Sequence, residues 1–429
     1  MTTILPLLVG AIGFLTIVVA LRLGPPDPAR TVTAARLTIV ATAIVNQSWL
    51  QSTVTLVVGC VATIALSAMF VTTVVRRQSE GIVLNGRHLL VSALPVWLFL
   101  VDVVRYPIGD GPGTFARLLP VIVVLALLPI LAVPPGPDTV LQPVMFGFGL
   151  ACAMTAFAPQ AWVSCTEFKC GPLGQLFAGP FSSENYFAAT AGLAALTAAT
   201  VATGRTRVLV ILLAGVVLYA SNSRTTQLGV AIALVLAVLA MRTSIGRRPM
   251  VSTVVPFSVL GLGVWLNYSV ATDAFSNRGL IWDIGTRALG EDWILGRGLS
   301  SWTPEVLARN YMHSQSLLLL YGGGAVAVLL YALVVCAALS QGDARMSVVA
   351  TTLVGFVLLR GLTELAWNPL AIDGTLFLFF PLIIFATAHE RRVGSETQSR
   401  EVDGRGTPAR DPGPSIEVRD RGQGAQGSA

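Results

Sequence analysis

The chain has 429 residues, of which 54% are apolar and only 12% are charged, and its mean hydropathy is +0.73. A soluble domain carries about 25% charged residues, so this composition excludes soluble and disordered proteins and indicates a membrane protein with many spans. The net charge of +6 does not indicate a nucleic-acid partner, because the basic residues are scattered between apolar stretches. We therefore expect membrane lipids, and no nucleic acid, among the partners.

Thirteen apolar windows approach the roughly 20 residues that a helix needs to cross a bilayer. In chain order they cover residues 4–22, 34–48, 52–75, 89–104, 116–132, 139–158, 184–203, 207–220, 225–241, 250–268, 313–339, 346–364 and 370–388. The second window is short and contains Arg36, Asn46 and Gln47, so twelve spans with an altered N-terminal entry is the alternative. Either count predicts an all-α, polytopic membrane protein of about 12 or 13 transmembrane helices.

The basic residues predict how these spans are oriented, since short cytoplasmic loops carry an excess of Lys and Arg. With the C-terminus in the cytoplasm, 19 of the 28 basic residues lie inside, seven of them in the tail. Residues 1–390 would then form a transmembrane domain whose long extracytoplasmic loop, residues 269–311, carries short interfacial helices. Residues 391–429 are rich in Gly, Arg, Asp, Ser and Pro, which predicts a disordered cytoplasmic tail.

A second hydrophilic connector, residues 159–183, contains two of the five cysteines, Cys165 and Cys170. The other three lie in apolar windows, so the chain has no disulfide framework. Cys165 and Cys170 can form a disulfide if this loop faces an oxidising compartment.

Five charged or titratable residues fall on one face of the membrane. Even numbers of spans separate Glu184, Arg224, Arg278, His313 and Glu364 along the chain, and the orientation makes this shared face the outer one. Both long hydrophilic loops lie on the same side. Long loops carry function more often than short ones, so we expect the functional site there.

Three polar motifs each open a span that runs inward from this face. They are "ENYF" (184–187), "SNSRTTQ" (221–227) and "MHSQS" (312–316). In the long loop, "SNRGLIW" (276–282) predicts a surface helix capped by Ser276 and ended by Gly290. A second short helix is expected from Thr303.

The surface helix is expected to bury one apolar stripe. Its members at helical spacing are Leu280, Ile281, Ile284 and Ala288. This amphipathic pattern predicts a helix that lies along the membrane surface.

The chemistry that these motifs favour is the binding of an anion. Free N–H groups and the positive helix end attract anions at helix N-termini, and Arg224 and Arg278 would add forked donors that suit phosphate oxygens. His313 lies beside a helix N-terminus and arginines, which disfavour the imidazolium, so we expect a neutral general base at pH 7. No second histidine or cysteine pair faces His313, so we expect no metal.

Each of these residues also has a simpler explanation. Arg224 can snorkel to the interface, and a single histidine at a helix start is commonly a cap or a solvated residue. Arg360 and Glu364, at i and i+4, can neutralise one another. Charged groups inside a bilayer cost about 2.5–3.5 kcal/mol each, so the joint placement of several on one face favours a function.

The order of these motifs resembles the O-antigen ligase and O-antigen polymerase superfamily. The resemblance covers roughly residues 140–385 and lies in "SSENYFAA", "SNSRTTQLGV", "FSNRGLIWDIGTRALGEDWILGRGLSSW" and "HSQSLLLLYGGG". In that family the histidine is followed by Asn, Ser or Gln and, after nine further residues, by Gly. His313, Ser314 and Gly324 fit this pattern. Three positions after Gly324 the family has a small or hydroxyl residue, and Ala327, which lacks a hydroxyl, is a mild departure there.

The resemblance implies a GT-C-like membrane glycosyltransferase in the bacterial cytoplasmic membrane, with its active site on the extracytoplasmic side. The donor would be a glycan on undecaprenyl or another polyprenyl diphosphate, and the acceptor a hydroxyl of a glycolipid, a glycan or a protein. Arg224 and Arg278 would bind the diphosphate, and His313 would activate the acceptor, without metal or cofactor. Supporting positions are Glu184, Asn185, Ser223, Trp282, Arg297, Ser314, Arg360 and Glu364.

Three alternatives stay open at this stage. A polymerase uses the same donor as a ligase, and the sequence does not separate the two. A transporter or lipid flippase would place charges near the midplane, whereas these lie at the outer ends of spans. GT-C enzymes that use polyprenyl monophosphate sugars resemble one another in an acidic motif in the first outer loop, but no acidic residue precedes Asp27 here.

Overall fold

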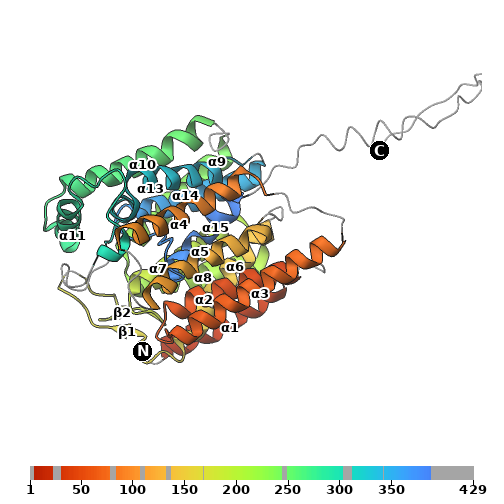
Figure 1. Cartoon of the computed structure of the whole chain (residues 1–429). Helices are drawn as coiled ribbons and strands as arrows, with labels where there is room; N and C mark the ends of the chain where they lie inside the picture. Colours follow the sequence, from red (N-terminus) through yellow and green to blue (C-terminus); the bar gives the residue numbers. More distant parts are fainter. Residues whose placement is uncertain are drawn as a thin grey trace, which may run out of the picture. The chain divides into compact units, whose positions relative to one another are not determined.

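The computed structural model describes residues 4–22, 30–77, 84–106, 112–131, 137–167, 169–243, 249–302, 312–341 and 343–387. Helices make up most of this part of the chain (Figure 1). The tail expected over 391–429 and the short helix expected from Thr303 lie outside the described residues.

All thirteen apolar windows are helical. Their helices are α1 (Ile4–Arg22), α2 (Arg30–Asn46), α3 (Thr53–Arg77), α4 (Gly86–Arg105), α5 (Pro112–Leu131), α6 (Pro137–Thr155), α7 (Glu184–Thr200), α8 (Gly204–Ser221), α9 (Arg224–Arg242), α10 (Pro249–Ser269), α13 (Gln315–Leu339), α14 (Ala344–Gly361) and α15 (Gly374–Thr387). Eight described helices, α1, α3, α4, α8, α9, α10, α13 and α14, are long and apolar enough to cross a membrane. The chain is therefore a multi-pass helical membrane protein.

The core of the bundle lies around α15. Every residue from Gly374 to Thr387 is buried, and α15 packs against α13, α2, α4, α14, α7 and α6. A helix that is apolar on all sides and surrounded by protein is a core helix. By contrast, α3 is mostly exposed, as expected for a helix whose apolar side chains face lipid.

The three polar residues of the second window hold α2 to its neighbours. The buried Arg36 donates from Nη2 to the carbonyl oxygen of Ile130 at the end of α5 (3.1 Å). Asn46 donates to the carbonyl of Ile372, and Gln47 accepts from the amide of Gly374 at the start of α15 (3.3 Å). Buried polar groups need such partners, so α2 is a helix of the bundle despite its polar residues.

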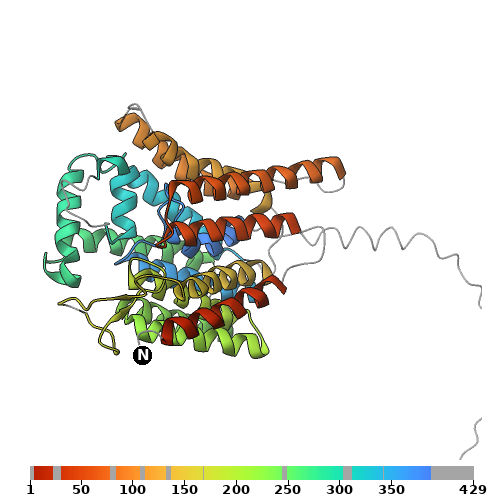
Figure 2. The same ribbon diagram turned by 90° about the horizontal axis from the view of Figure 1, so that it is seen from below.

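A small hairpin stands at one end of the bundle, the end at which α11 also lies (Figures 1 and 2). Strands β1 (Trp162–Val163) and β2 (Leu176–Phe177) pair antiparallel, with Trp162 opposite Phe177. A disulfide joins Cys165 and Cys170 in the connection between them. Asn222 donates to the carbonyl of Cys170 (2.7 Å), which anchors the hairpin to the turn before α9.

Helix α11 (Ala274–Leu289) begins earlier than expected. Asp273 occupies the position before its first residue, so Ser276 lies inside the helix and does not cap it. Arg278 accordingly stands in the second turn and not at the N-terminus. The end is as predicted, because Gly290 follows with a φ of +53°, a conformation that favours glycine.

The apolar stripe predicted for α11 is only partly correct. Leu280 is 47% exposed, whereas Ile281, Trp282 and Leu289 are buried. The indole N–H of Trp282 donates to the carbonyl of Met312 (3.0 Å). Because a buried indole needs a hydrogen-bond partner, this contact turns Trp282 and its neighbours inward, toward the start of α13.

The segment after α11 packs against a run of glycines in α13, residues 322–324. Arg297 donates its amide to the carbonyl of Tyr321 (2.7 Å), and Ala325 donates to Trp293 (2.9 Å). A Cβ on Gly324 would lie 2.0 Å from the carbonyl oxygen of Ile294. Only glycine permits an approach this close, so these glycines hold the segment after α11 against the bundle.

The same segment is tied to the end of α4 by Asp102. This buried carboxylate accepts from the amide (2.8 Å) and hydroxyl (2.6 Å) of Ser300 and pairs with Arg117 (3.1 Å). Charge-assisted hydrogen bonds of this kind are stronger than neutral ones.

We expect Asp102→Ala to lower the free energy of unfolding by about 1–3 kcal/mol, because it leaves the half-buried amide and hydroxyl of Ser300 without their partner. Thermal unfolding of the purified chain in detergent measures the change. Asp283→Ala is the matched control, since it breaks only the exposed i,i+4 pair with Arg287, a kind of pair worth about 0.3–0.5 kcal/mol. If the two variants were equally stable, Asp102 would not hold the segment after α11 in place.

Candidate active site

A buried carboxylate, Glu364, joins segments that lie far apart in the sequence. Glu364 follows the C-terminus of α14 and its side chain is only 8% exposed. Its Oε1 pairs with Nη2 of Arg278 from α11, and its Oε2 lies 3.1 Å from Nδ1 of His313, just before α13. Arg278 also donates from Nη1 to the carbonyl of Thr363 (2.8 Å). Three predicted site residues therefore form one cluster, the His313–Glu364–Arg278 cluster.

Glu364 is ionised in this cluster at physiological pH. Burial would raise the pKa of its carboxyl, but the hydrogen bond with His313 and the charges of Arg278 and Arg360 outweigh burial and lower the pKa to about 2. An ionised carboxylate only accepts hydrogen bonds, so Nδ1 of His313 carries a proton. In the neutral imidazole the lone pair then lies on Nε2, and this atom can accept a proton.

Arg360 does not form the expected i,i+4 pair with Glu364. The amide of Glu364 still donates to the carbonyl of Arg360 (2.9 Å), but the carboxylate of Glu364 pairs with Arg278 and His313. Arg360 is 1% exposed and donates from Nη1 to the hydroxyl of Thr226 (3.2 Å). Its Nε has no hydrogen-bond partner among the described residues.

From Thr226 a chain of polar contacts continues to the start of α7. The hydroxyl of Ser223 lies 3.0 Å from that of Thr226 and 2.8 Å from Oδ1 of Asn185. Lys169 donates from Nζ to the same Asn185 oxygen (3.2 Å) and to Glu184 (2.7 Å). The starts of α7 and α9 are thereby linked to Arg360, which adds its charge to the Glu364 cluster.

The three motifs open helices, as predicted. Ser183 caps α7 by accepting from the amide of Asn185, and Ser314 caps α13 by accepting from the amide of Leu317. Helix α9 begins at Arg224, which is exposed and has no hydrogen bond or ion pair with any described residue. Arg224 is therefore a cation at the start of a helix without a counter-ion in that part of the chain.

Residues with positive φ lie in two of these motifs and near the start of α11. The non-glycine residues with positive φ in the described segments are Asn222 (+49°), Phe275 (+52°) and His313 (+48°). Such a conformation costs roughly 1–3 kcal/mol and tends to occur at functional sites. Asn222 precedes Arg224 by two residues and Phe275 precedes Arg278 by three, so each predicted substrate-facing residue lies at or beside a strained position.

Two predicted supporting residues and one neighbour fix the segment that carries His313. Trp282 binds the carbonyl of Met312, and Ser314 contacts the hydroxyl of Ser316 (3.0 Å). The buried Gln315 donates to the carbonyl of Trp367 (2.9 Å) and accepts from two amides of the 362–373 loop. These contacts position His313.

Arg297 is a predicted supporting residue that the structure keeps apart from the cluster. It donates to the carbonyl of Ala288 and lies 3.7 Å from Asp292, and its amide binds the carbonyl of Tyr321. These contacts hold the loop after α11 in place, so Arg297 serves the packing of that loop.

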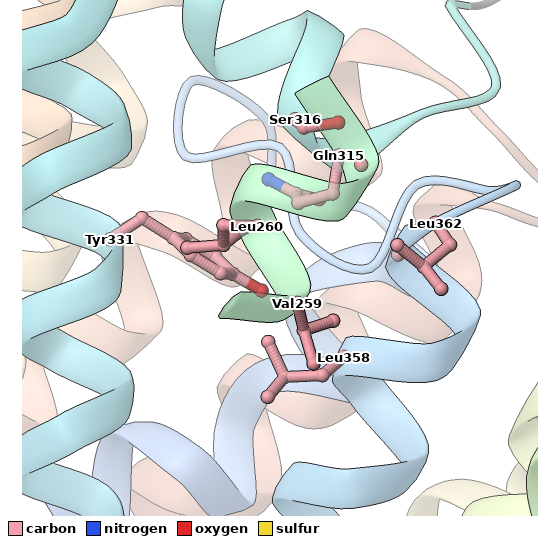
Figure 3. A pocket seen from close by; sticks show the side chains of 9 residues that line it. Val259, Leu260, Gln315, Ser316, Tyr331, Leu358 and Leu362 are labelled. Carbon is pink, nitrogen blue, oxygen red and sulfur yellow. The ribbon is translucent and has the colours of Figure 1, made fainter. Parts of the chain in front are cut away.

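A small cavity behind Gln315 and Ser316 is too small for a substrate. Besides Gln315 and Ser316, its lining includes Val259, Leu260, Leu358 and Leu362 (Figure 3). Its volume is about 10 Å³, at most the space of one water molecule. In the described segments no three His, Cys, Asp or Glu residues are placed to hold a metal ion, and the cluster itself has the donors for an anion.

Sequence reasoning missed Lys169 and Thr226. Lys169 is the one lysine of the chain and lies between the two bridged cysteines, which was a usable signal. Thr226 lies one turn into α9 and resembles any other helical threonine. Its contact with Arg360 depends on how α9 and α14 pack, which no local pattern predicts.

Comparison with protein-family models, with curated proteins and with solved structures finds no match. The fold defines a multi-pass helical membrane protein. The His313–Glu364–Arg278 cluster and the exposed Arg224 are its candidate active site.

The ionised Glu364 predicts a pH-dependent stability difference between the wild type and Glu364→Gln. The folded pKa of about 2 lies below the ordinary value of 4.5, so the carboxylate stabilises the fold fully above about pH 4.5 and less as the pH falls toward 2. We expect Glu364→Gln to cost about 3 kcal/mol at pH 7, with the difference shrinking below pH 4.5.

Thermal unfolding in detergent between pH 3 and pH 8 measures this difference. Glu167→Gln is the control, because Glu167 is exposed and has no partner among the described residues. A Glu364→Gln deficit that is absent at pH 7, or that grows as the pH falls, would refute the buried ion pair.

Proposed function

We propose that the protein transfers a glycan from a polyprenyl diphosphate carrier to an acceptor hydroxyl at the outer face of the bacterial cytoplasmic membrane. The observation that carries this proposal is the contact of His313 Nδ1 with the ionised Glu364, beside Arg278. It supports an oriented general base next to a cation, which is what glycosyl transfer from a diphosphate requires. The motif resemblance to O-antigen ligases and polymerases supports the same reaction.

The proposed step needs no metal or cofactor. The acceptor oxygen attacks the anomeric carbon of the glycan while Nε2 of His313 takes the hydroxyl proton. A bond forms between the acceptor oxygen and the anomeric carbon, and the bond from that carbon to the diphosphate oxygen breaks with its electron pair on the diphosphate. Glu364 keeps the imidazole oriented and stabilises the imidazolium that forms.

The charges around the cluster favour the leaving diphosphate. Arg278 and Arg360 together outnumber the single carboxylate of Glu364, and Lys169 is balanced by Glu184. Arg224, exposed at the start of α9, adds a forked donor and the positive end of a helix. Groups of this kind stabilise the negative charge that develops on the leaving group, which is commonly the main source of an enzyme's rate enhancement.

The GT-C-like architecture and the sidedness complete the proposal. The disulfide between Cys165 and Cys170 supports an extracytoplasmic location of the 159–183 loop, because disulfides persist in oxidising compartments. The donor would be a lipid-diphosphate-linked glycan, and the acceptor a glycolipid, a glycan or a protein. A ligase attaches the glycan to such an acceptor, whereas a polymerase lengthens the lipid-linked chain, so product analysis separates the two.

We expect His313→Ala and Arg278→Ala to lower turnover at least 100-fold, the usual scale for a general base or an oxyanion stabiliser. The assay is transfer by the purified chain from a polyprenyl-diphosphate-linked glycan. Arg224→Lys should also be impaired, because Lys keeps the charge but loses the fork.

The matched control for Arg278→Ala is Arg287→Ala. Arg287 lies on the same helix, but it is exposed and, among the described residues, pairs only with Asp283. Near wild-type turnover in His313→Ala and Arg278→Ala would refute the proposed function, as would an equal loss in Arg287→Ala.

The sidedness predicts which engineered cysteines react from outside. With Cys60, Cys152 and Cys336 replaced by serine, we expect Arg224→Cys to react with a membrane-impermeant maleimide in intact cells, because Arg224 is exposed at the proposed outer end. Arg345→Cys, on the opposite side, should react only after permeabilisation. The reverse pattern would invert the proposed orientation.

A further inference from the structure

A polar cleft lies between the α2–α3 turn and three other segments, residues 158–163, 179–182 and 371–373. Its volume is about 690 Å³, within the range of about 300–1,000 Å³ that small-molecule sites occupy. We propose that this cleft binds uncharged sugar units of the glycan. The inference takes from the proposed function only that a glycan is the substrate.

The lining of the cleft carries little charge. None of the described residues that line it is Lys or Arg, and its one charged residue is Asp373. Phosphate recognition relies on cations and helix N-termini, so this cleft does not suit the diphosphate. Amide and hydroxyl groups dominate instead, from Gln47, Gln51, Gln160 and Ser182.

These polar groups have unused hydrogen-bonding capacity. Gln47 uses only Oε1, toward the amide of Gly374, and its Nε2 has no partner among the described residues. Asp373 uses Oδ1 for the amide (2.8 Å) and hydroxyl (2.6 Å) of Thr375, and its carboxylate also accepts a hydrogen bond from the backbone of Leu376. Sugar hydroxyls both donate and accept, so this mixture of donors and acceptors matches them.

An aromatic ring stands at the rim of the cleft. Trp49 is 45% exposed and lines the cleft, and its backbone amide donates to the carbonyl of Pro180 (3.0 Å). An indole ring offers a large apolar face together with a polar N–H. Such a ring can pack against the apolar face of a sugar, while the hydroxyls at the edge of that sugar bind the amide groups of the cleft.

Two chain segments lead from the cleft to the candidate active site. Ser182 lines the cleft and lies three residues before Asn185, so their Cα atoms are at most about 11 Å apart. The 362–373 loop after α14 contains Glu364 of the cluster and ends with Asp373 of the cleft. A glycan whose reducing end meets the cluster can therefore place further sugar units in the cleft.

Saturation-transfer NMR on the purified full chain in nanodiscs measures saccharide binding directly. The probes are maltotriose, mannotriose and galactotriose, with trigalacturonate as the charged comparison. We expect saturation transfer to at least one neutral trisaccharide, and at least tenfold weaker binding in Trp49→Ala and Gln160→Ala. Asp373→Asn keeps the Oδ1 acceptor for Thr375 while it replaces Oδ2 by a donor, and it should also weaken binding.

Trp293→Ala is the matched control, because Trp293 is 53% exposed and does not line the cleft. It should bind like the wild type. The inference is overturned if no neutral trisaccharide receives saturation, if trigalacturonate binds more tightly than all three, or if the cleft variants bind like Trp293→Ala.

A second readout separates this inference from the proposed function. His313→Ala should lose transfer and keep saccharide binding. If the wild type binds trisaccharides in the cleft but does not transfer glycan, the proposed function alone is refuted. If the wild type transfers glycan and Trp49→Ala transfers it with the same kinetics, the cleft alone is refuted. In the transfer assay, Trp49→Ala raises the KM of whichever substrate, donor or acceptor, places its sugars there.

Discussion

The buried carboxylate of Glu364 is the constraint on which the end of the bundle that carries α11 depends. Removing a carboxylate from water is costly unless opposite charges and hydrogen bonds satisfy it. Its partners come from α11 and from the residue before α13, so both segments must fold back to the end of α14. The burial of Trp282 against Met312 and the contacts of Gln315 with the 362–373 loop hold them there. The orientation of His313 is therefore a consequence of the fold.

Two polar regions of different character follow from this arrangement. The cluster around Glu364 carries an excess of arginine, and the cleft carries amides, hydroxyls and Trp49. Residues 179–185 and 364–373 border both regions. Under the proposed function this separation assigns the charged leaving group to the arginines and the neutral sugars to the cleft. Strained backbone at Asn222, Phe275 and His313 is consistent with side chains held in place for substrate.

The helices could be predicted from the sequence because apolar length alone specifies them, and the parity of the spans was enough to place Arg278, His313 and Glu364 at one end. The pairing of Glu364 could not be predicted, since the local sequence offers Arg360 at i−4, whereas its actual partners, Arg278 and His313, are brought to it by the packing of distant segments. The predicted start of α11 was wrong, because Asp273 and not Ser276 precedes its first residue. The predicted buried face was only partly correct, because Trp282 turns inward to a distant carbonyl. Gln47 looks like a defect in a short span, but it anchors α15 and lines the cleft.

The most direct test of the account is a single-turnover measurement with the purified chain, a polyprenyl-diphosphate-linked glycan donor and excess EDTA, in the wild type and in His313→Ala. The account predicts that the wild type forms product in EDTA, and that His313→Ala binds the donor with unchanged affinity but transfers it at least 100-fold more slowly. Transfer by His313→Ala at the wild-type rate, or a wild type that binds the donor and leaves it intact with every acceptor class, would contradict it.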